Sequence, residues 1–415
     1  MKGTWLFTLL GSLFIIPSVI QTATASRSLS PGFLVATIVV SCLIYISTRV
    51  KLIKLPNPSI QVKVILLLSF VMQITWFLLS EPASIDFDKL LLSIPLLFSL
   101  LFCAQALGIL LIKISDKVNL ADLCTGYVSI FILLGISSLI WRVFPGLPVG
   151  NKQVVFFSEP SHYVFALTPF LLNSLCLSSR IKIVNFYQIS CLFILSILLE
   201  SVSLTVVVLF SLLAWFVMRY KSAETKLKSQ EFALVILFAI FIFSVLFLIS
   251  QNQYFLVRLN FFNVDLRDVK SHSSNISLLM GYQEAFLNLI KSHFLGVGFQ
   301  QMGISDPTGD FANLIYAANG AYTNRYEGTI LASKIISEFG LAGIFLIVAY
   351  VLYCLKIVFA CQTNNFSSIQ RFSIGLVISL VPYLFVRGGG YFSGSVLISL
   401  TGLLVLSHQK NLNLI

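Results

Sequence analysis

Two side chains of the sequence are candidates for accepting a proton in catalysis. Glu159 lies in the stretch "FFSEPSHYVFAL", at the mouth of a long apolar run. Pro160 follows it, and because proline suits the first turn of a helix, Glu159-Pro160-Ser161 predicts a helix entry that fixes the carboxylate at the rim. His293, in "SHFLGVGF", is of the residue type that exchanges protons near neutral pH. We take Glu159 and His293 as candidate catalytic residues. The alternative for each is stabilisation of a helix dipole.

Five arginines are the candidate substrate-binding residues, because a guanidinium fork matches the oxygens of a phosphate group. Arg142 lies one turn inside the end of an apolar run, and Arg387 opens "RGGGY" between two such runs. Charges within membrane-embedded structure are expensive, so both positions indicate function. The alternative for each arginine is a cation that reaches from the edge of a span into water. The full set is Arg142, Arg258, Arg267, Arg325 and Arg387.

Other polar residues near the apolar runs have plainer interpretations. Glu200 and Ser203 lie at another boundary and are expected to line the same cavity. Lys334 and Glu338 are four residues apart, which predicts a helical ion pair. The "DFD" at 86–88 offers two carboxylates, but a metal ion needs several converging oxygens. We expect no metal and no cofactor, since the sequence has neither zinc-type Cys/His spacing nor a phosphate-binding glycine loop.

The elements that position these residues are predicted transmembrane helices. The chain has 415 residues, of which 57% are hydrophobic and 10% charged, whereas about a quarter of a soluble domain is charged. Apolar runs long enough to cross ~30 Å of hydrocarbon recur along it. We predict an all-α, polytopic integral membrane protein. Its twelve expected transmembrane helices lie at 4–21, 33–50, 61–79, 89–113, 122–144, 162–178, 183–199, 201–218, 232–250, 334–358, 371–387 and 390–407. The first is expected to stay uncleaved, with a signal peptide ending in Ala-Thr-Ala as the alternative.

The orientation of the helices follows from lysine and arginine, which favour cytoplasmic loops. With the amino terminus inside, the cytoplasmic loops at 49–63 and 219–231 hold four basic residues each, and the acidic segment 80–88 faces outwards. The net charge of +11 therefore reflects topology and does not indicate nucleic-acid binding. Three regions result: 1–250 with transmembrane helices 1–9, a large periplasmic loop at 251–333, and 334–415 with transmembrane helices 10–12.

The large loop contains one predicted amphipathic helix near 276–293. Apolar residues recur there at helical spacing, and Ser274 or Asn275 suits the N-cap. The helix is expected to end before "GVG", where Gly296 and Gly298 permit a sharp turn. Its apolar face is expected to lie on the outer leaflet or across the helical bundle.

Four motifs follow one another along the chain: "FFSEPSHYVFAL", "LLESVSLTVVVLF", "SHFLGVGF" and "SKIISEFGLAGIFL". In this order and spacing, over roughly 150–350, the sequence resembles the O-antigen polymerase and ligase family. The resemblance implies an enzyme that acts on undecaprenyl-diphosphate-linked oligosaccharides at the outer face of the bacterial inner membrane. Ligases and many polymerases of that family carry a histidine-asparagine pair where this chain reads "YTNRYEGT". The departure counts against ligase chemistry and leaves both Glu159 and His293 as candidates for the catalytic base.

The motifs and the resemblance together predict a metal-independent membrane glycosyltransferase. It would polymerise lipid-linked repeat units into O-antigen, capsular polysaccharide or exopolysaccharide, with the arginines binding the leaving diphosphate and Glu159 or His293 activating the acceptor hydroxyl. Expected partners are the undecaprenyl-diphosphate-linked oligosaccharide, membrane lipid and a chain-length regulator protein, with no nucleic acid.

Three alternatives belong to other classes of protein: a ligase that moves the glycan to lipid A core, a flippase or transporter, and a non-catalytic scaffold. Transporters tend to show repeated halves and polar residues at the bilayer midplane. In this sequence the charges gather at the outer rim beside one large loop, which disfavours transport.

Overall fold

The computed structural model describes residues 2–24, 28–48, 71, 85–143, 154–157, 159–177, 183–219, 273–322, 324–363 and 366–409. These residues form helices, turns and one isolated bridge between Val154 and Phe157, so the all-α prediction is confirmed for them. The helices are α1 (Lys2–Ala23), α2 (Ser30–Thr48), α4 (Phe87–Ile114), α5 (Leu120–Val143), α6 (Pro160–Cys176), α7 (Ile183–Leu198), α8 (Val202–Arg219), α11 (Ser273–Lys291), α12 (Asp310–Asn319), α13 (Leu331–Thr363), α14 (Ser368–Ile378), α15 (Leu380–Phe385) and α16 (Gly394–His408).

Several helices begin at side chains that satisfy the free N–H groups of a first turn. Asp86 caps α4 and accepts a hydrogen bond from the Lys89 amide at 2.9 Å. Ser367 and Gln370 form a capping box at α14, with each side chain bonded to the other residue's backbone. Ser393 caps α16 in the same way as Asp86 caps α4. These caps fix where the chain enters the bundle.

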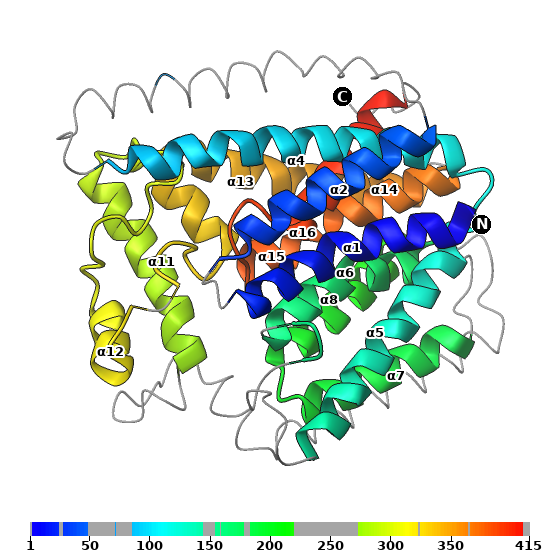
Figure 1. Ribbon diagram of the computed structural model, residues 1–415, viewed down its shortest axis with the longest axis horizontal. Helices are drawn as coiled ribbons and strands as arrows, with labels where there is room; N and C mark the ends of the chain where they lie inside the picture. The colour runs from blue at the N-terminus through cyan, green and yellow to red at the C-terminus, as the bar shows by residue number, and fades with distance from the viewer. Residues whose placement is uncertain are drawn as a thin grey trace.

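The apolar helices pack side by side, with α11 and α12 beside one end of the bundle and the N-terminus at the other end (Figure 1). α4 contacts α2 and α16, and α6 contacts α5, α8 and α14. Leu107 of α4, Phe170 of α6 and Leu397 of α16 are fully buried in one shared core. The outward faces are also apolar, as at Leu91 and Phe98 of α4, and this pattern suits contact with lipid.

Five helices among the described residues are long and apolar enough to cross a membrane: Trp5–Ala23, Phe87–Ile114, Leu120–Trp141, Leu331–Gln362 and Ser368–Phe385. This finding supports the prediction of a membrane protein. The expected spans at 61–79 and 232–250 lie outside the described residues, and each of the others overlaps a helix of the bundle. The number of twelve spans and the periplasmic placement of the large loop stay predictions.

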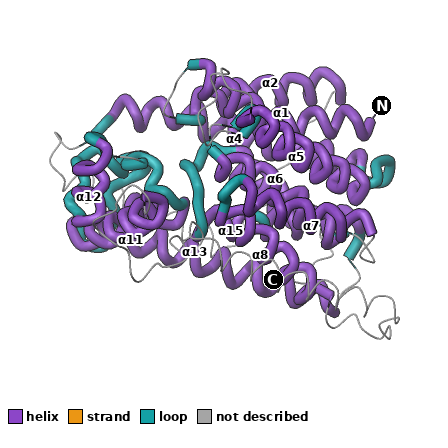
Figure 2. Tube along the Cα trace, turned by 90° about the horizontal axis from the view of Figure 1, so that it is seen from below, coloured by secondary structure: helices purple, strands orange, loops and turns teal. Residues whose placement is uncertain are grey.

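α11 occupies the place of the predicted amphipathic helix. It packs against α13 and α12, burying Ile276 and Met280, while Tyr282 and Phe286 remain exposed. The N-cap prediction for this helix is wrong, because it begins at Ser273 and both expected capping residues lie inside its first turn. Most of the described loops gather beside α11 and α12 (Figure 2).

Two glycine motifs of the sequence interlock by backbone hydrogen bonds. The amide of Val297 donates to Ser337 at 2.8 Å, and that of Leu341 donates to the carbonyl of Phe294 at 3.0 Å. Gly296 has a φ of 88° and Gly340, inside α13, a φ of 57°, both in the left-handed region that favours glycine. "GVG" and "FGLAG" are therefore two halves of one backbone joint that fastens the loop to α13.

We expect Gly340→Ala to destabilise the protein by ~2 kcal/mol or more, because a Cβ there would be strained at positive φ and would collide with the Phe294 carbonyl. Thermal unfolding of the detergent-solubilised protein measures the loss. Gly320→Ala is the matched control, since Gly320 has a φ of 68° but no heavy atom within 4 Å of its Cβ position. Equal losses in the two variants would contradict a role for the joint.

The topology prediction is tested by cysteine labelling in a background without the native cysteines. A cysteine at Asn313, exposed on α12, is expected to react with an impermeant reagent added outside the inner membrane. A cysteine at position 224 is expected to react only after the membrane is opened. Labelling of position 224 from outside in intact cells would invert the orientation.

Candidate functional site

A cavity of about 2120 Å³ opens where the bundle meets the α12 region. Its lining residues come from α2, α4, α6, α8 and α11, from the end of α15 and the segment after it, and from the chain between 300 and 334. Part of the wall is apolar, including Leu34, Leu96 and Phe385. The expected residues Glu200 and Ser203 also line it. The cavity therefore offers charged groups and an apolar wall to the same ligand.

Glu159 and Arg387 meet in this cavity although they are far apart in the sequence. Arg387 Nη2 lies 3.1 Å from Glu159 Oε2, and Ser161 Oγ donates to the same oxygen at 2.9 Å. Glu159 is the N-cap residue of α6, with Pro160 at the first helical position, yet its side chain makes no capping hydrogen bond. The carboxylate is thus used to pair with Arg387 and not to cap its own helix.

The pairing determines the protonation state of Glu159. Burial raises the pKa of its carboxyl group, but Arg387, His162 and the hydrogen bond from Ser161 outweigh burial and hold the pKa below its ordinary value. The Glu159 carboxylate is therefore ionised at neutral pH and is a weak proton acceptor. About half of its side chain is exposed, whereas that of Arg387 is 20% exposed.

Glu327 is a further carboxylate in the cavity, in addition to Glu159 and Glu200, and the sequence analysis missed it. Burial raises the pKa of Glu327, Lys334 and Lys89 lower it, and Glu159 raises it further, so that it stays above the ordinary value. Among the described residues, no hydrogen bond or ion pair involves its carboxylate. Glu327 lies two residues after the candidate Arg325 in "YTNRYEGT", and this position could have indicated it as a site residue.

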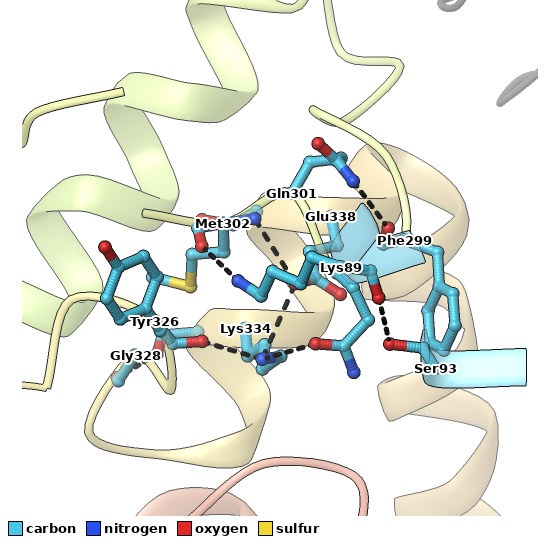
Figure 3. Close-up of polar contacts among 12 residues, drawn as sticks. Lys89, Ser93, Phe299, Gln301, Met302, Tyr326, Gly328, Lys334 and Glu338 are labelled. Atoms are coloured by element: carbon cyan, nitrogen blue, oxygen red, sulfur yellow. Dashed lines mark hydrogen bonds and ion pairs between the residues drawn. The ribbon is translucent and has the colours of Figure 1, made fainter. Parts of the chain in front are cut away.

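Two lysines reach the segment next to Glu327 from different helices (Figure 3). Lys334 of α13 is buried, and its Nζ donates to the Tyr326 carbonyl at 2.7 Å. Lys89 of α4 donates to the Met302 carbonyl at 3.3 Å and lies 4.6 Å from the centre of the Tyr326 ring. Both lysines line the cavity, which adds positive charge to that of Arg387.

The expected pairing of Lys334 with Glu338 is present, with Nζ and Oε1 3.7 Å apart. Glu338 is fully buried and accepts a hydrogen bond from the Met302 amide at 3.3 Å. Lys334 also lies 3.4 Å from Oε1 of Gln300. This buried network fixes the position of Lys334, so the residue both takes part in a structural ion pair and lines the cavity.

Arg325 lines the cavity, but its guanidinium N–H groups are bonded to its own loop. Nη1 lies 2.8 Å from Asp306, Nε donates to the Gly303 carbonyl at 2.7 Å, and Nη2 donates to that of Ile304 at 3.1 Å. Arg325 and Asp306 also line a smaller cavity of about 340 Å³ beside α11. Arg325 is therefore a clamp on the 303–306 segment, at the wall between the two cavities.

His293, the other predicted catalytic residue, does not join this site. His293 is exposed, has a φ of 49° just after α11, and lines neither cavity. Arg142 belongs to α5, but its side chain lies outside the described residues, as do Arg258 and Arg267 entirely.

No protein-family model matches the chain, and no curated protein and no solved structure is similar to it. A functional assignment must therefore come from the cavity itself.

Proposed function

We propose that the protein is a membrane glycosyltransferase that joins undecaprenyl-diphosphate-linked repeat units into O-antigen, capsular polysaccharide or exopolysaccharide. The observation that carries this proposal is the Glu159–Arg387 pair, which lies in one large cavity with two lysines, further carboxylates including Glu327, and an apolar wall. A lipid-linked sugar diphosphate needs these same three features. Positive charge binds its diphosphate, a carboxylate serves its reacting hydroxyl, and apolar surface receives its lipid.

The reaction forms one glycosidic bond and breaks one sugar–phosphate bond. The acceptor hydroxyl oxygen attacks the anomeric carbon of the donor sugar, and the bond from that carbon to the diphosphate oxygen breaks. The diphosphate leaves with the electron pair, while the hydroxyl proton passes to a carboxylate. Arg387 and Lys89 stabilise the charge that grows on the diphosphate as the bond breaks.

Glu327 is a better proton acceptor than Glu159. Glu159 is held by Arg387 and Ser161, and a carboxylate stabilised in its ionised form gains little by taking a proton. Burial makes the ionised form of Glu327 less favourable, so this group takes a proton more readily. We assign proton acceptance to Glu327 and the orientation of the Arg387 fork to Glu159.

Deletion of the gene tests the function through the ladder of surface glycans on a gel. Polymerase loss leaves lipid core capped by single repeat units. Bare core would assign the chain to the ligase or flippase class, and an unchanged ladder would exclude all three functions. Purified protein in liposomes should then form polymer from lipid-linked repeat units without added metal or nucleotide.

A further inference from the structure

The short helix α12 and the turn that follows it present a tyrosine pair to the large cavity. Its inner face, Ala312 and Ile315, is buried against Ile276 and Met280 of α11. The helix ends at Gly320, whose φ of 68° turns the chain back. The turn brings the ring of Tyr322 to within 4.8 Å of the Tyr316 ring, centre to centre.

The ring of Tyr316 is more accessible than the packing of α12 requires, whereas Tyr322 is partly buried and packs against the core that joins α12 to α11. Tyr316 is 49% exposed and does not belong to the core that joins α12 to α11. Tyr316 and Tyr322 line the large cavity together with the amides of Asn319 and Asn324. An aromatic face beside hydrogen-bonding amides fits a sugar ring, which presents C–H groups on its faces and hydroxyl groups around its edge.

We propose that Tyr316 and Tyr322 form a saccharide-binding platform that holds the glycan chain during polymerisation. This inference rests on the proposed function, because the platform shares its cavity with Glu159 and Arg387. When the diphosphate is bound at Arg387, the sugars attached to it extend along the rest of the cavity wall, where the tyrosines lie.

Anchoring in the membrane surface is the other role that exposed tyrosines can have. An interfacial helix presents a broad apolar face to the lipid. On α12 the exposed side chains beside Tyr316 are instead polar or small: Asp310, Asn313, Ala317 and Asn319. The composition of this face therefore favours a glycan over a lipid surface.

The test compares three double variants of the full-length protein. Tyr316→Ala/Tyr322→Ala removes both rings, the corresponding phenylalanine pair keeps them, and the corresponding leucine pair keeps apolar bulk without a ring. Tyr282→Ala is the matched control, since Tyr282 is 41% exposed on α11 but does not line the cavity. Glycan-ladder length is measured in cells. Affinity is measured in nanodiscs with surface polysaccharide from the wild-type cells, released by mild acid and sorted by length.

We expect the alanine and leucine pairs to bind the polysaccharide about tenfold more weakly and to shorten the ladder. The phenylalanine pair and Tyr282→Ala should match the wild type. A normal ladder in the leucine pair would assign the tyrosines to anchoring or packing and overturn the platform. A normal ladder in the alanine pair would do the same. If the alanine pair lowers protein abundance, the ladder lengths and affinities of the leucine pair and the phenylalanine pair decide whether the rings bind the glycan. If gene deletion leaves the ladder unchanged, the proposed function fails. The affinities in nanodiscs alone then decide whether the two tyrosines bind the polysaccharide.

Discussion

Replacing Arg387 by alanine is expected to remove every glycan band longer than one repeat unit. Arg387 contributes a charged fork at the cavity wall, and the loss of one such group from a charge-stabilised transition state costs ~10²–10³-fold in rate. Arg387→Lys keeps the charge but loses the fork, so we expect an intermediate rate and a shortened ladder. The measurement is the ladder at equal protein abundance, together with the initial rate in liposomes.

Two further variants show whether this loss belongs to the site. Arg371→Ala removes an arginine of α14 that does not line the cavity and should leave the ladder normal. Glu159→Gln should reduce the rate less than Arg387→Ala, and the double variant should be no worse than Arg387→Ala alone, because the two residues act as a pair. Full-length polymer in Arg387→Ala at normal abundance would exclude diphosphate binding by this residue.

Helix positions were predictable because length and hydropathy are local properties of the sequence. The run that opens with Glu159-Pro160-Ser161 predicted the start of α6, and proline at the first helical position confirms it. Gly296 and Gly298 predicted a turn, and both have positive φ. The N-cap of α11 was predicted wrongly, since several polar residues in succession could each occupy that position.

The site was only partly predictable, because its contacts join distant segments. Glu159 and Arg387 were each selected for their place at a span boundary, but no local pattern indicates a bond across 228 residues. In the sequence, Lys89 follows an acidic segment and has no feature that distinguishes it from an ordinary interfacial cation. Only the fold shows that Lys89 and Lys334 of α13 contact the same loop. The role of Glu327 likewise depends on burial, which a short polar stretch of sequence does not reveal.

Glu327→Gln is expected to reduce polymerisation by ~10²–10⁴-fold, the usual effect of losing a general base. Glutamine keeps the size and hydrogen-bonding capacity of the side chain but cannot take the hydroxyl proton. Glu327→Asp retains a carboxylate on a shorter arm, so we expect partial activity. Glu159→Gln is the matched comparison, since it removes a charge from the same cavity while leaving Glu327 in place.

The pH dependence of kcat/KM separates the two carboxylates, because its acid limb reports the pKa of the base in the free enzyme. The base must be ionised to accept a proton, so activity falls as the pH drops through its pKa. Burial raises the pKa of Glu327, which places the limb above the ~4.3 of an ordinary glutamate. With Glu159 as the base the limb would lie below that value, since Arg387 and its neighbours outweigh burial and lower the pKa.

An acid limb below the ordinary pKa of glutamate, together with normal polymer in Glu327→Gln, would assign the role of base to Glu159. Normal polymer in both glutamine variants would leave His293→Gln as the next variant to test, and its normal activity would mean that departure of the diphosphate, assisted by Arg387, carries the reaction without a side-chain base.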